Sequence, residues 1–388
     1  MLQIAAGQYF NPGVRLHERV HRRVFYGNCL VLHEHAVILP VGQLKGTDWG
    51  PAVCSIVIEA VDRLESEFPD GEGGWLVATG GDELIDDVAY VTSSALNPTL
   101  TRSSEEARRL IGPNMRPGRH GGAAAMFSGL FGRAQPLHDA QVDDLRDFMS
   151  DLLALGREDF ARVMRVTRSA VNATRRAIDD PTGAYTDLVA ALESLSEDRL
   201  TGPVAWDRYD GSKRRLIDTA LEGADPAMAE RVRGAVLEAD RVGLKRRFVS
   251  STLARSAPSY YRDEAVSAVR APRAAELERM LGIAYNIRSR RSHVLQDLGD
   301  EAWAFTDGAE TVFAAQHNIP RILTLAGLWR LVRHVTHQLV ASAPKPPPEP
   351  WDYRQALPGL LQVQLAPCSG SRGAMPSPTG MRRSGSTA

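Results

Sequence analysis

The sequence predicts an α+β fold, in which an N-terminal mixed α/β domain is followed by an all-α helical bundle. Short runs rich in valine, leucine and isoleucine dominate residues 1–112. Long segments with apolar residues three or four positions apart dominate residues 140–342. Glycine and proline interrupt the chain between these two regions. A chain of 388 residues has room for two or three domains and a sizeable core.

Composition and charge are those of an ordinary globular protein. Hydrophobic residues make up 43% of the chain, charged residues make up 24%, and the formal net charge is −1. Because this charge creates no global basic field, any nucleic-acid site has to be a local patch. The three cysteines lie far apart, which indicates neither a disulfide framework nor a cysteine zinc site and favours the reducing cytoplasm. We recognise no signal peptide and no apolar run long enough for a membrane span, so we expect no membrane association.

The N-terminal domain is predicted to contain four strands and two helices. The segment Pro51–Phe68 is predicted to be a helix, because its apolar residues fall on one face and Pro69–Gly74 ends it. A short helix is predicted after Ser103 or Ser104, with two glutamates in its first turn. The predicted strands are Phe25–Leu32, His35–Gly42, Trp75–Ala78 and Val88–Thr92.

The rest of the chain divides into a linker, a helical domain and a tail. Residues 113–139 are predicted to be a linker, because glycine and proline break any regular element there. Residues 343–388 are rich in proline, serine and glycine and are predicted to be a largely disordered tail. The helices predicted between them are Val142–Leu155, Phe160–Ile178, Ala184–Leu195, Pro226–Gly243, Leu277–Leu298, Thr311–Gln316 and Pro320–Val340.

The helix predicted at Leu277–Leu298 carries the most informative pattern. Its apolar residues keep helical spacing throughout, so one face should be buried. At about 100° per residue, Arg288 and Arg291 fall within or beside the apolar stripe, whereas His293 falls well away from it. A cation on the buried side needs a partner or a route to water. This helix is therefore where we look for a functional site.

Three segments form a pattern in order along the chain. The first is Ala191-Leu-Glu193 in a predicted helix, and the second is the basic step Lys213-Arg-Arg215. The third is Ala284-Tyr-Asn-Ile-Arg288, which continues to His293 with the spacing Arg-x4-His. The same spacing recurs at Arg133–His138, where Pro136 prevents a regular helix. The three segments in this order resemble the HEPN superfamily and, within it, the ApeA-like HEPN domains, and the resemblance covers roughly residues 184–342.

The resemblance implies metal-independent RNA cleavage, in which a 2′-hydroxyl attacks the adjacent phosphodiester. His293 would be the general acid and base, and Arg288 would bind the scissile phosphate. Glu193 would orient or neutralise the arginine. Members of the family typically form their sites between two such helices of a homodimer, which implies a homodimer through the helical domain.

Further residues on the same helix are candidates for RNA binding. These are Tyr285, Asn286 and Arg291, which lie on either side of Arg288. The resemblance also implies a role in phage defence or a toxin-like role, with a regulatory ligand or protein at the N-terminal domain.

Two other functions remain open. In many active members of the family an Asn, Asp or His follows the motif arginine, whereas Ser289 follows it here. This departure favours a catalytically inactive HEPN scaffold for dimerisation or for binding nucleotides or RNA. A helical protein without any nucleic-acid role is the third hypothesis, and it predicts no salt-sensitive RNA binding.

Other candidate sites are better explained as ordinary polar surface. His334 and His337 share a helical face, and the segment His33–His35 places two histidines on one face of a strand, but neither has a clear third ligand. The acids of Asp82–Asp87 are typical of a solvated turn. The chain lacks the phosphate-binding loop of nucleotide hydrolases, the Gly-x-Gly-x-x-Gly dinucleotide pattern and Gly-x-Ser-x-Gly. We therefore predict neither a metal nor a cofactor.

Overall fold

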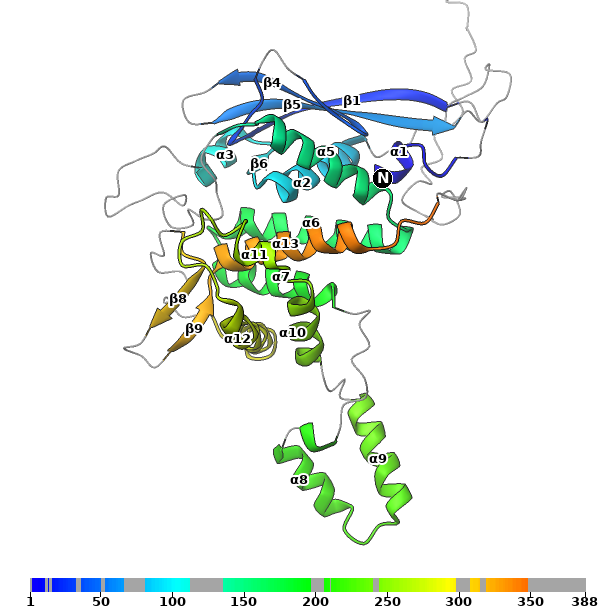
Figure 1. Ribbon diagram of the computed structural model, residues 1–388, viewed down its shortest axis with the longest axis vertical. Coiled ribbons are helices and arrows are strands. Elements are labelled where there is room, and N and C mark those ends of the chain that lie inside the picture. Colours follow the sequence, from blue (N-terminus) through cyan, green and yellow to red (C-terminus); the bar gives the residue numbers. More distant parts are fainter. Residues whose placement is uncertain are drawn as a thin grey trace, which may run out of the picture.

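The fold is mixed α+β, with a curled five-stranded antiparallel sheet and many helices (Figure 1). It is seen in a computed structural model, which describes residues 2–10, 13, 16–32, 36–49, 53–65, 81–111, 135–196, 206–209, 211–239, 244–297, 308–314 and 319–347. The structural statements below concern these residues. None of the described helices combines the length and the hydropathy that crossing a membrane requires.

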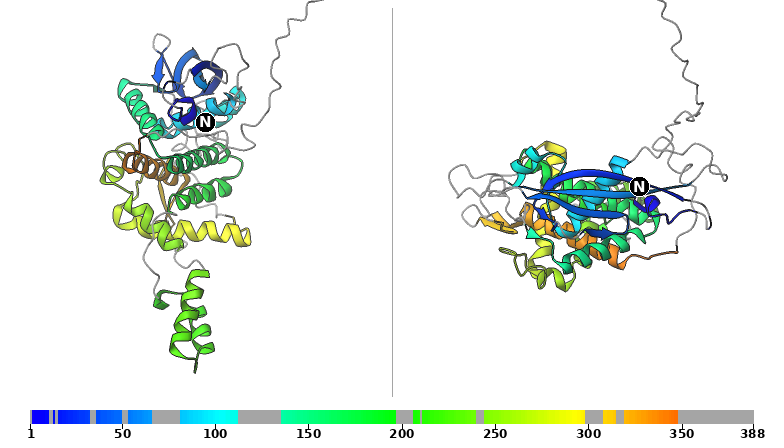
Figure 2. Two further views of the ribbon diagram at one scale, coloured as in Figure 1. Left: turned by 90° about the vertical axis from the view of Figure 1, so that its right-hand side faces the viewer. Right: turned by 90° about the horizontal axis from the view of Figure 1, so that it is seen from above.

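The sheet has the strand order β3-β4-β5-β1-β6. Two long strands, β1 (Leu16–Gly27) and β5 (Cys54–Glu65), pair along their whole length. The shorter strands are β3 (Val37–Leu39), β4 (Gly42–Trp49) and β6 (Leu100–Thr101). The helices α1 (Leu2–Ala5), α2 (Gly81–Leu96) and α5 (Asp139–Leu153) lie below one face, and the opposite face is open (Figures 1 and 2).

Strand β5 corrects the prediction of a helix at Pro51–Phe68. Every second residue of β5 is buried against the helices, including Ile56, Ile58 and Ala60. The residues between them, such as Val57 and Val61, are half-buried on the open face. Because both faces of the strand carry apolar residues, the sequence also satisfies helical spacing. The density of β-branched valine and isoleucine favours the strand instead.

Helix α2 corrects the strand predicted at Val88–Thr92, which lies within this helix. Val88 and Ala89 are buried together with Leu84 and Ile85, one turn earlier on the same face. The short helix predicted after Ser103 is confirmed as α3 (Ser104–Ile111). The Ser103 hydroxyl accepts a hydrogen bond of 3.3 Å from the backbone of Glu106, which caps that helix. The predicted strand Trp75–Ala78 lies outside the described residues.

Most of the later helices agree closely with the predicted segments, but the helix predicted at Pro320–Val340 begins only at Leu325, because Ile319–Leu323 forms a strand. These later helices are α5, α6 (Arg157–Arg176), α7 (Pro181–Ser194), α9 (Pro226–Ala239), α12 (Ala274–Val294) and α13 (Leu325–Ser342). Helix α7 begins at Pro181, and the Asp180 side chain caps it by accepting from Gly183 N at 2.7 Å. Three more helices and a short 3₁₀ turn complete the set: α8 (Gly211–Ala220), α10 (Leu244–Ala254), α11 (Pro258–Tyr261) and η1 (Trp206–Arg208).

The region 140–342 was predicted to be all-α, but it contains a β-hairpin. Its strands are β8 (Thr311–Ala314) and β9 (Ile319–Leu323), which pair antiparallel. The segment Thr311–Gln316, predicted as a helix, therefore begins with a strand, in keeping with its run of Thr, Val and Phe. The predicted linker 113–139 ends in β7 (Gln135–Pro136), which pairs in parallel with β2 (Cys29–Leu30).

Helix α13 lies at the centre of the molecule and bonds to both the sheet-bearing and the helical parts. The half-buried Arg333 side chain donates to the carbonyls of Ser94 at 2.6 Å and Ala95 at 2.8 Å, at the C-terminal end of α2. The Trp329 indole donates to Asn97 Oδ1 at 2.6 Å. A cation at the negative end of a helix dipole is favourable, and it also satisfies carbonyls that lack partners within the helix.

On the other side, α13 is tied to the segments around α11 and β8. The Arg330 guanidinium donates to both carboxylate oxygens of Glu310, at 2.5 and 2.6 Å, and lies 3.9 Å from the ring centre of Tyr260. His334 Nδ1 lies 2.7 Å from Glu264 Oε1, while its Nε2 accepts from Ala257 N at 3.0 Å. These contacts fix α13 against residues from 257 to 310.

The histidines of α13 correct the prediction that they form a polar surface. His334 is buried in the contacts just described. The His337 ring stacks on Phe148 with ring centres 4.2 Å apart, and burial together with the nearby Arg333 charge lowers its pKa to about 4. His337 is therefore neutral at pH 7, and it is half-buried against Phe148.

Replacing Arg333 with methionine tests the role of α13. The substitution removes the donors to the carbonyls of Ser94 and Ala95 and leaves the Ala95 carbonyl without its partner, so we expect the free energy of unfolding in urea to fall by about 2 kcal/mol. Arg290→Met, on an exposed face of α12, is the matched control and should change it by less than about 0.5 kcal/mol. Equal effects of the two substitutions would show that the Arg333 contacts do not hold α2 and α13 together.

Candidate functional site

The candidate site lies where α7, α10 and α12 pack together (Figure 1). Arg288 of α12 and Glu193 of α7 form an ion pair, with 2.9 Å between NH2 and Oε2. Their side chains are 30% and 17% exposed, so the pair sits at the edge of the core and can be reached by solvent. Ala284 and Leu281 are buried on the same face of α12, about one and two turns before Arg288. This packing directs the arginine toward α7.

Tyr285 shares the Glu193 carboxylate with Arg288. Burial raises the pKa of the Tyr285 hydroxyl, and so do the charge of Glu193 and the hydrogen bond between these side chains, whereas the charges of Arg288 and Arg247 oppose the shift. The Tyr285 ring packs at a tilt against Phe248 of α10, with 5.6 Å between the ring centres. The aromatic contact and the hydrogen bond together orient this side chain.

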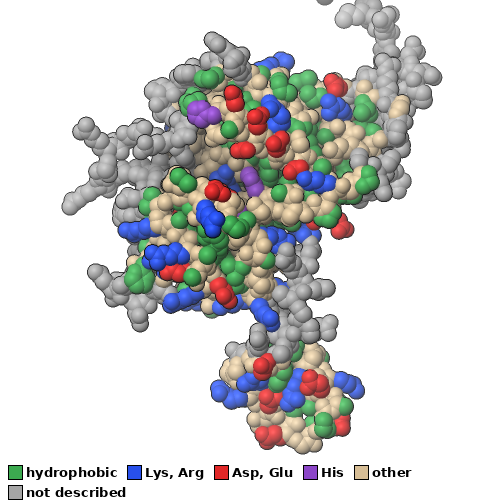
Figure 3. Space-filling view, viewed as in Figure 1, with side chains coloured by type: hydrophobic (Ala, Val, Ile, Leu, Met, Phe, Trp, Pro, Cys, Tyr) green, Lys and Arg blue, Asp and Glu red, His purple; other side chains and the backbone are tan. Residues whose placement is uncertain are grey.

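Helix α10 adds cations beside this pair. Lys245 Nζ donates to Asn286 Oδ1 at 3.1 Å, and the lysine stem crosses α12 at Gly282. Arg247 lies near enough to Tyr285 for its charge to act on the hydroxyl. Lys245 was not predicted as a site residue, although it begins the basic run Lys245–Arg247. Acidic and basic side chains intermingle on the face of the molecule shown in Figure 3, so this patch is local.

Two of the predicted site residues, His293 and Arg291, do not point toward the Arg288 side chain within one chain. His293 is exposed on the last turn of α12. It lies five residues from Arg288, a rotation of about 140° around the helix, so the two side chains point in different directions. Arg291 donates to Asp297 Oδ1 at 2.6 Å and to the carbonyl of Leu295 at 3.3 Å. It therefore helps to end the helix.

At the end of α12 the apolar stripe is exposed, although it was predicted to be buried. Val294 and Leu295 were expected to be buried with the rest of that stripe. They are 68% and 74% exposed instead, because the helix extends beyond the elements that cover its first half. Leu295 ends the helix with a φ of 53°, and Leu298 lies outside the described residues.

The acidic residues near Asp82–Asp87, which were another candidate site, form structural contacts instead. Asp87 is buried and binds Arg168 of α6 through two hydrogen bonds of 2.7 Å. Asp86 binds Arg102 at the surface, at 2.5 and 2.8 Å. Within the described part of the chain, no three His, Cys, Asp or Glu side chains gather as a metal site would require. The segment His33–His35 lies outside the described residues.

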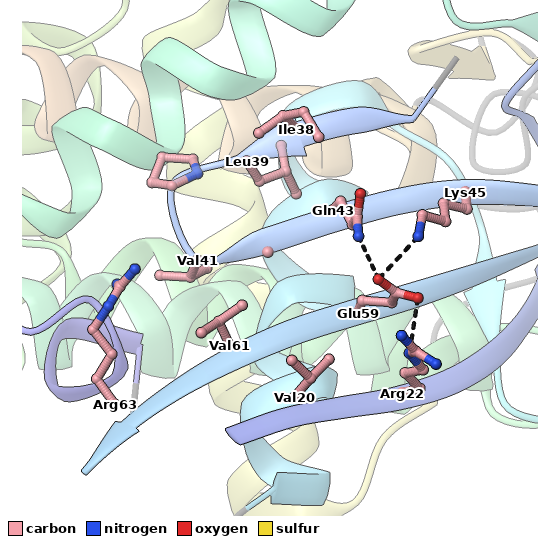
Figure 4. Close-up of a pocket in the computed structure, with 12 residues that line it drawn as sticks. Val20, Arg22, Ile38, Leu39, Val41, Gln43, Lys45, Glu59, Val61 and Arg63 are labelled. Atoms are coloured by element: carbon pink, nitrogen blue, oxygen red, sulfur yellow. Dashed lines mark hydrogen bonds and ion pairs between the residues drawn. The ribbon is translucent and has the colours of Figure 1, made fainter. Parts of the chain in front are cut away.

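A hollow of about 400 Å³ lies on the open face of the sheet and was not predicted (Figure 4). Glu59 is buried there and accepts hydrogen bonds from Gln43 and from Lys45 at 3.2 Å, and it pairs with Arg22 at 2.9 Å. Burial opposes ionisation, but these contacts outweigh it and lower the pKa of Glu59. Both oxygens of the carboxylate are thus occupied in holding strands β1, β4 and β5 together.

The arrangement of Arg288, Glu193, Tyr285 and Lys245 is suited to anion binding. A guanidinium presents several N–H donors in one plane, which matches the oxygens of a phosphate. The Glu193 carboxylate occupies donors that a phosphate would use, so a phosphate has to compete with it. Comparisons with protein-family models, curated proteins and solved structures gave no match to this chain.

The substitution Glu193→Gln should lower the pKa of Tyr285 toward its ordinary value. The wild-type carboxylate charge disfavours the tyrosinate, so the neutral amide should let the hydroxyl ionise at a lower pH. The measurement is a pH titration of the Tyr285 ring resonance, assigned with Tyr285→Phe. Glu278→Gln, exposed on α12, is the control that should leave the titration unchanged. An unchanged midpoint in Glu193→Gln would contradict the contact between the two side chains.

Proposed function

We propose that this protein is a HEPN-type RNA-acting protein and a metal-independent endoribonuclease, with a role in phage defence or a toxin-like role. In this proposal residues 140–342 form a HEPN-like helical unit, and the preceding sheet-bearing part responds to a regulatory ligand or protein. The observation that carries the proposal is the 2.9 Å pair between Arg288 and Glu193, which joins the two family-like motifs across α7 and α12.

Within the proposal, Arg288 binds the scissile phosphate and stabilises the charge that develops on it. Lys245 and Arg247 bind neighbouring phosphates, and Tyr285 and Asn286 contact the same strand. His293 removes the proton from the attacking 2′-hydroxyl and returns a proton to the departing 5′-oxygen. The new P–O2′ bond forms as the P–O5′ bond breaks, leaving a 2′,3′-cyclic phosphate and a 5′-hydroxyl.

The separation of His293 from Arg288 requires a second copy of the chain in this mechanism. Because the two side chains point about 140° apart on one helix, a twofold partner has to bring its own His293 toward Arg288. The proposal therefore includes a homodimer through the helical part of the chain.

The second candidate is an inactive RNA-binding scaffold. It is favoured by the exposed position of His293, by Ser289 after the arginine, and by the carboxylate that already neutralises Arg288. In this function Arg288 and the α10 cations bind phosphates, and no bond is broken.

Cleavage of labelled single-stranded RNA in EDTA separates the two functions. We expect the wild type to cleave and to leave cyclic-phosphate ends, and His293→Ala to lose cleavage by about a hundredfold or more. His138→Ala is the matched control, since His138 is also exposed and belongs to the other Arg-x4-His pair. Equal cleavage by His293→Ala would remove this histidine from the mechanism. RNA binding without cleavage, lost in Arg288→Ala, would assign the scaffold function.

A further inference from the structure

The hollow on the open face of the sheet is crossed by one row of paired residues from four strands (Figure 4). Ile38 of β3 pairs with Gln43 of β4, and Gln43 pairs in turn with Glu59 of β5. On its other side, Glu59 pairs with Arg22 of β1. Residues directly opposite each other on paired strands point to the same face of a sheet, so these four side chains share the open face.

Apolar side chains lie on both sides of this row. Val61 pairs with Val20 on one side, and Val57 pairs with Val24 on the other. Val20 is 51% exposed, and Ile38, at the end of the row, is 56% exposed. The helices that pack on the sheet lie against its other face (Figures 1 and 2). The hollow therefore presents apolar surface that a bound molecule can remove from water.

The charges that line the hollow do not balance. They are the cations Arg22, Lys45 and Arg63 and a single carboxylate, that of Glu59. Arg63 binds Glu18, which is not a lining residue, at 3.1 Å. Arg22 and Lys45 are left to share Glu59, at 2.9 and 3.2 Å. Because one carboxylate neutralises only one of these two cations, the hollow carries an excess positive charge.

The two cations form the rim of the hollow and the carboxylate forms its floor. The Glu59 side chain is only 8% exposed, whereas those of Arg22 and Lys45 are 68% and 42% exposed. Arg22 binds Glu59 through Nε, and a guanidinium carries further donors at its outer end. The ammonium of Lys45 likewise has three donors. Both cations can therefore keep their contact with Glu59 and still donate to an anion from solution.

We propose that this hollow binds a free medium-chain fatty acid as its anion. The ligand carboxylate accepts hydrogen bonds from Arg22 and Lys45, and the alkyl chain covers Val20 and Val61. The volume of about 400 Å³ is within the range of sites for small molecules and is too small for a folded partner. Binding here does not depend on RNA cleavage. The further step, that this acid is the regulatory ligand of the sheet-bearing part, rests on the proposed function.

Calorimetric titration of the full chain at low salt tests the class of ligand. We expect octanoate to bind with saturation, because it provides both the anion and the apolar chain. Acetate lacks the chain and octylamine carries the opposite charge, so each should bind at least about tenfold more weakly. Equal binding of octylamine, or no binding of octanoate, would overturn the proposal. Binding of anionic phosphatidylglycerol vesicles without binding of octanoate would overturn it in favour of a membrane surface.

Substitutions of opposite expected sign test the location of the site. Arg22→Gln removes a rim cation and should weaken octanoate binding about tenfold. Glu59→Gln removes the competing negative charge, and its amide oxygen can still accept from Gln43 or Lys45, so octanoate should bind several-fold more tightly. Arg19→Gln is the matched control, since Arg19 is exposed on the opposite face of β1.

The opposite signs separate a binding site from a loss of stability. A general weakening of the sheet would lower octanoate binding in Arg22→Gln and Glu59→Gln alike. Weaker binding in both variants, or the same affinity in Arg22→Gln and Arg19→Gln, would place octanoate elsewhere and overturn the proposal. Neither result would bear on RNA cleavage, which is measured separately with His293→Ala.

Discussion

The structure depends on the guanidinium of Arg333, which bonds helix α13 to the end of α2. This group satisfies carbonyls at the end of α2, while the next turns of α13 bind Glu310 and Glu264 on the opposite side. A buried charge is costly unless every donor finds a partner, so these contacts permit few alternative positions for α13. Helix α13 also packs against α7, and α7 carries Glu193. The position of the candidate site therefore follows from how α13 is held.

At the candidate site, the Glu193 carboxylate competes with any anion from solution for the Arg288 guanidinium. Arg288 lies at the edge of the core, where an unpaired guanidinium would be unfavourable, and Glu193 supplies the missing charge. The pair is accessible to solvent, and Lys245 and Arg247 raise the local positive potential. In the proposed function a phosphate replaces the carboxylate, so Glu193 would stabilise the empty site and limit its affinity for RNA.

The sequence predicted the parts of the fold in which the apolar residues follow one spacing only, that of a helix or that of a strand. In α7, Tyr185, Leu188 and Leu192 are all buried as their spacing indicates, and Glu193 and Arg288 were selected from motifs on separate helices. Strand β5 was predicted wrongly as a helix. Both of its faces carry apolar residues, so its sequence satisfies the helical spacing as well as the strand spacing. The burial of His337 depends on Phe148 from another helix, and no local pattern reveals such a partner. The direction of His293, away from the apolar stripe, followed from the helical period, whereas the exposure of Val294 and Leu295 depends on where the covering elements end.

Binding of single-stranded RNA in EDTA, measured by fluorescence anisotropy over a range of salt concentrations, tests the central claim most directly. The account predicts that Arg288→Ala weakens binding by about tenfold and lowers the salt dependence by about one phosphate contact. It predicts that Glu193→Gln strengthens binding, because the arginine loses its internal competitor, and that Arg290→Ala has a small effect. If Arg288→Ala and Arg290→Ala behave alike and Glu193→Gln has no effect, then the paired arginine on α12 is not an RNA site.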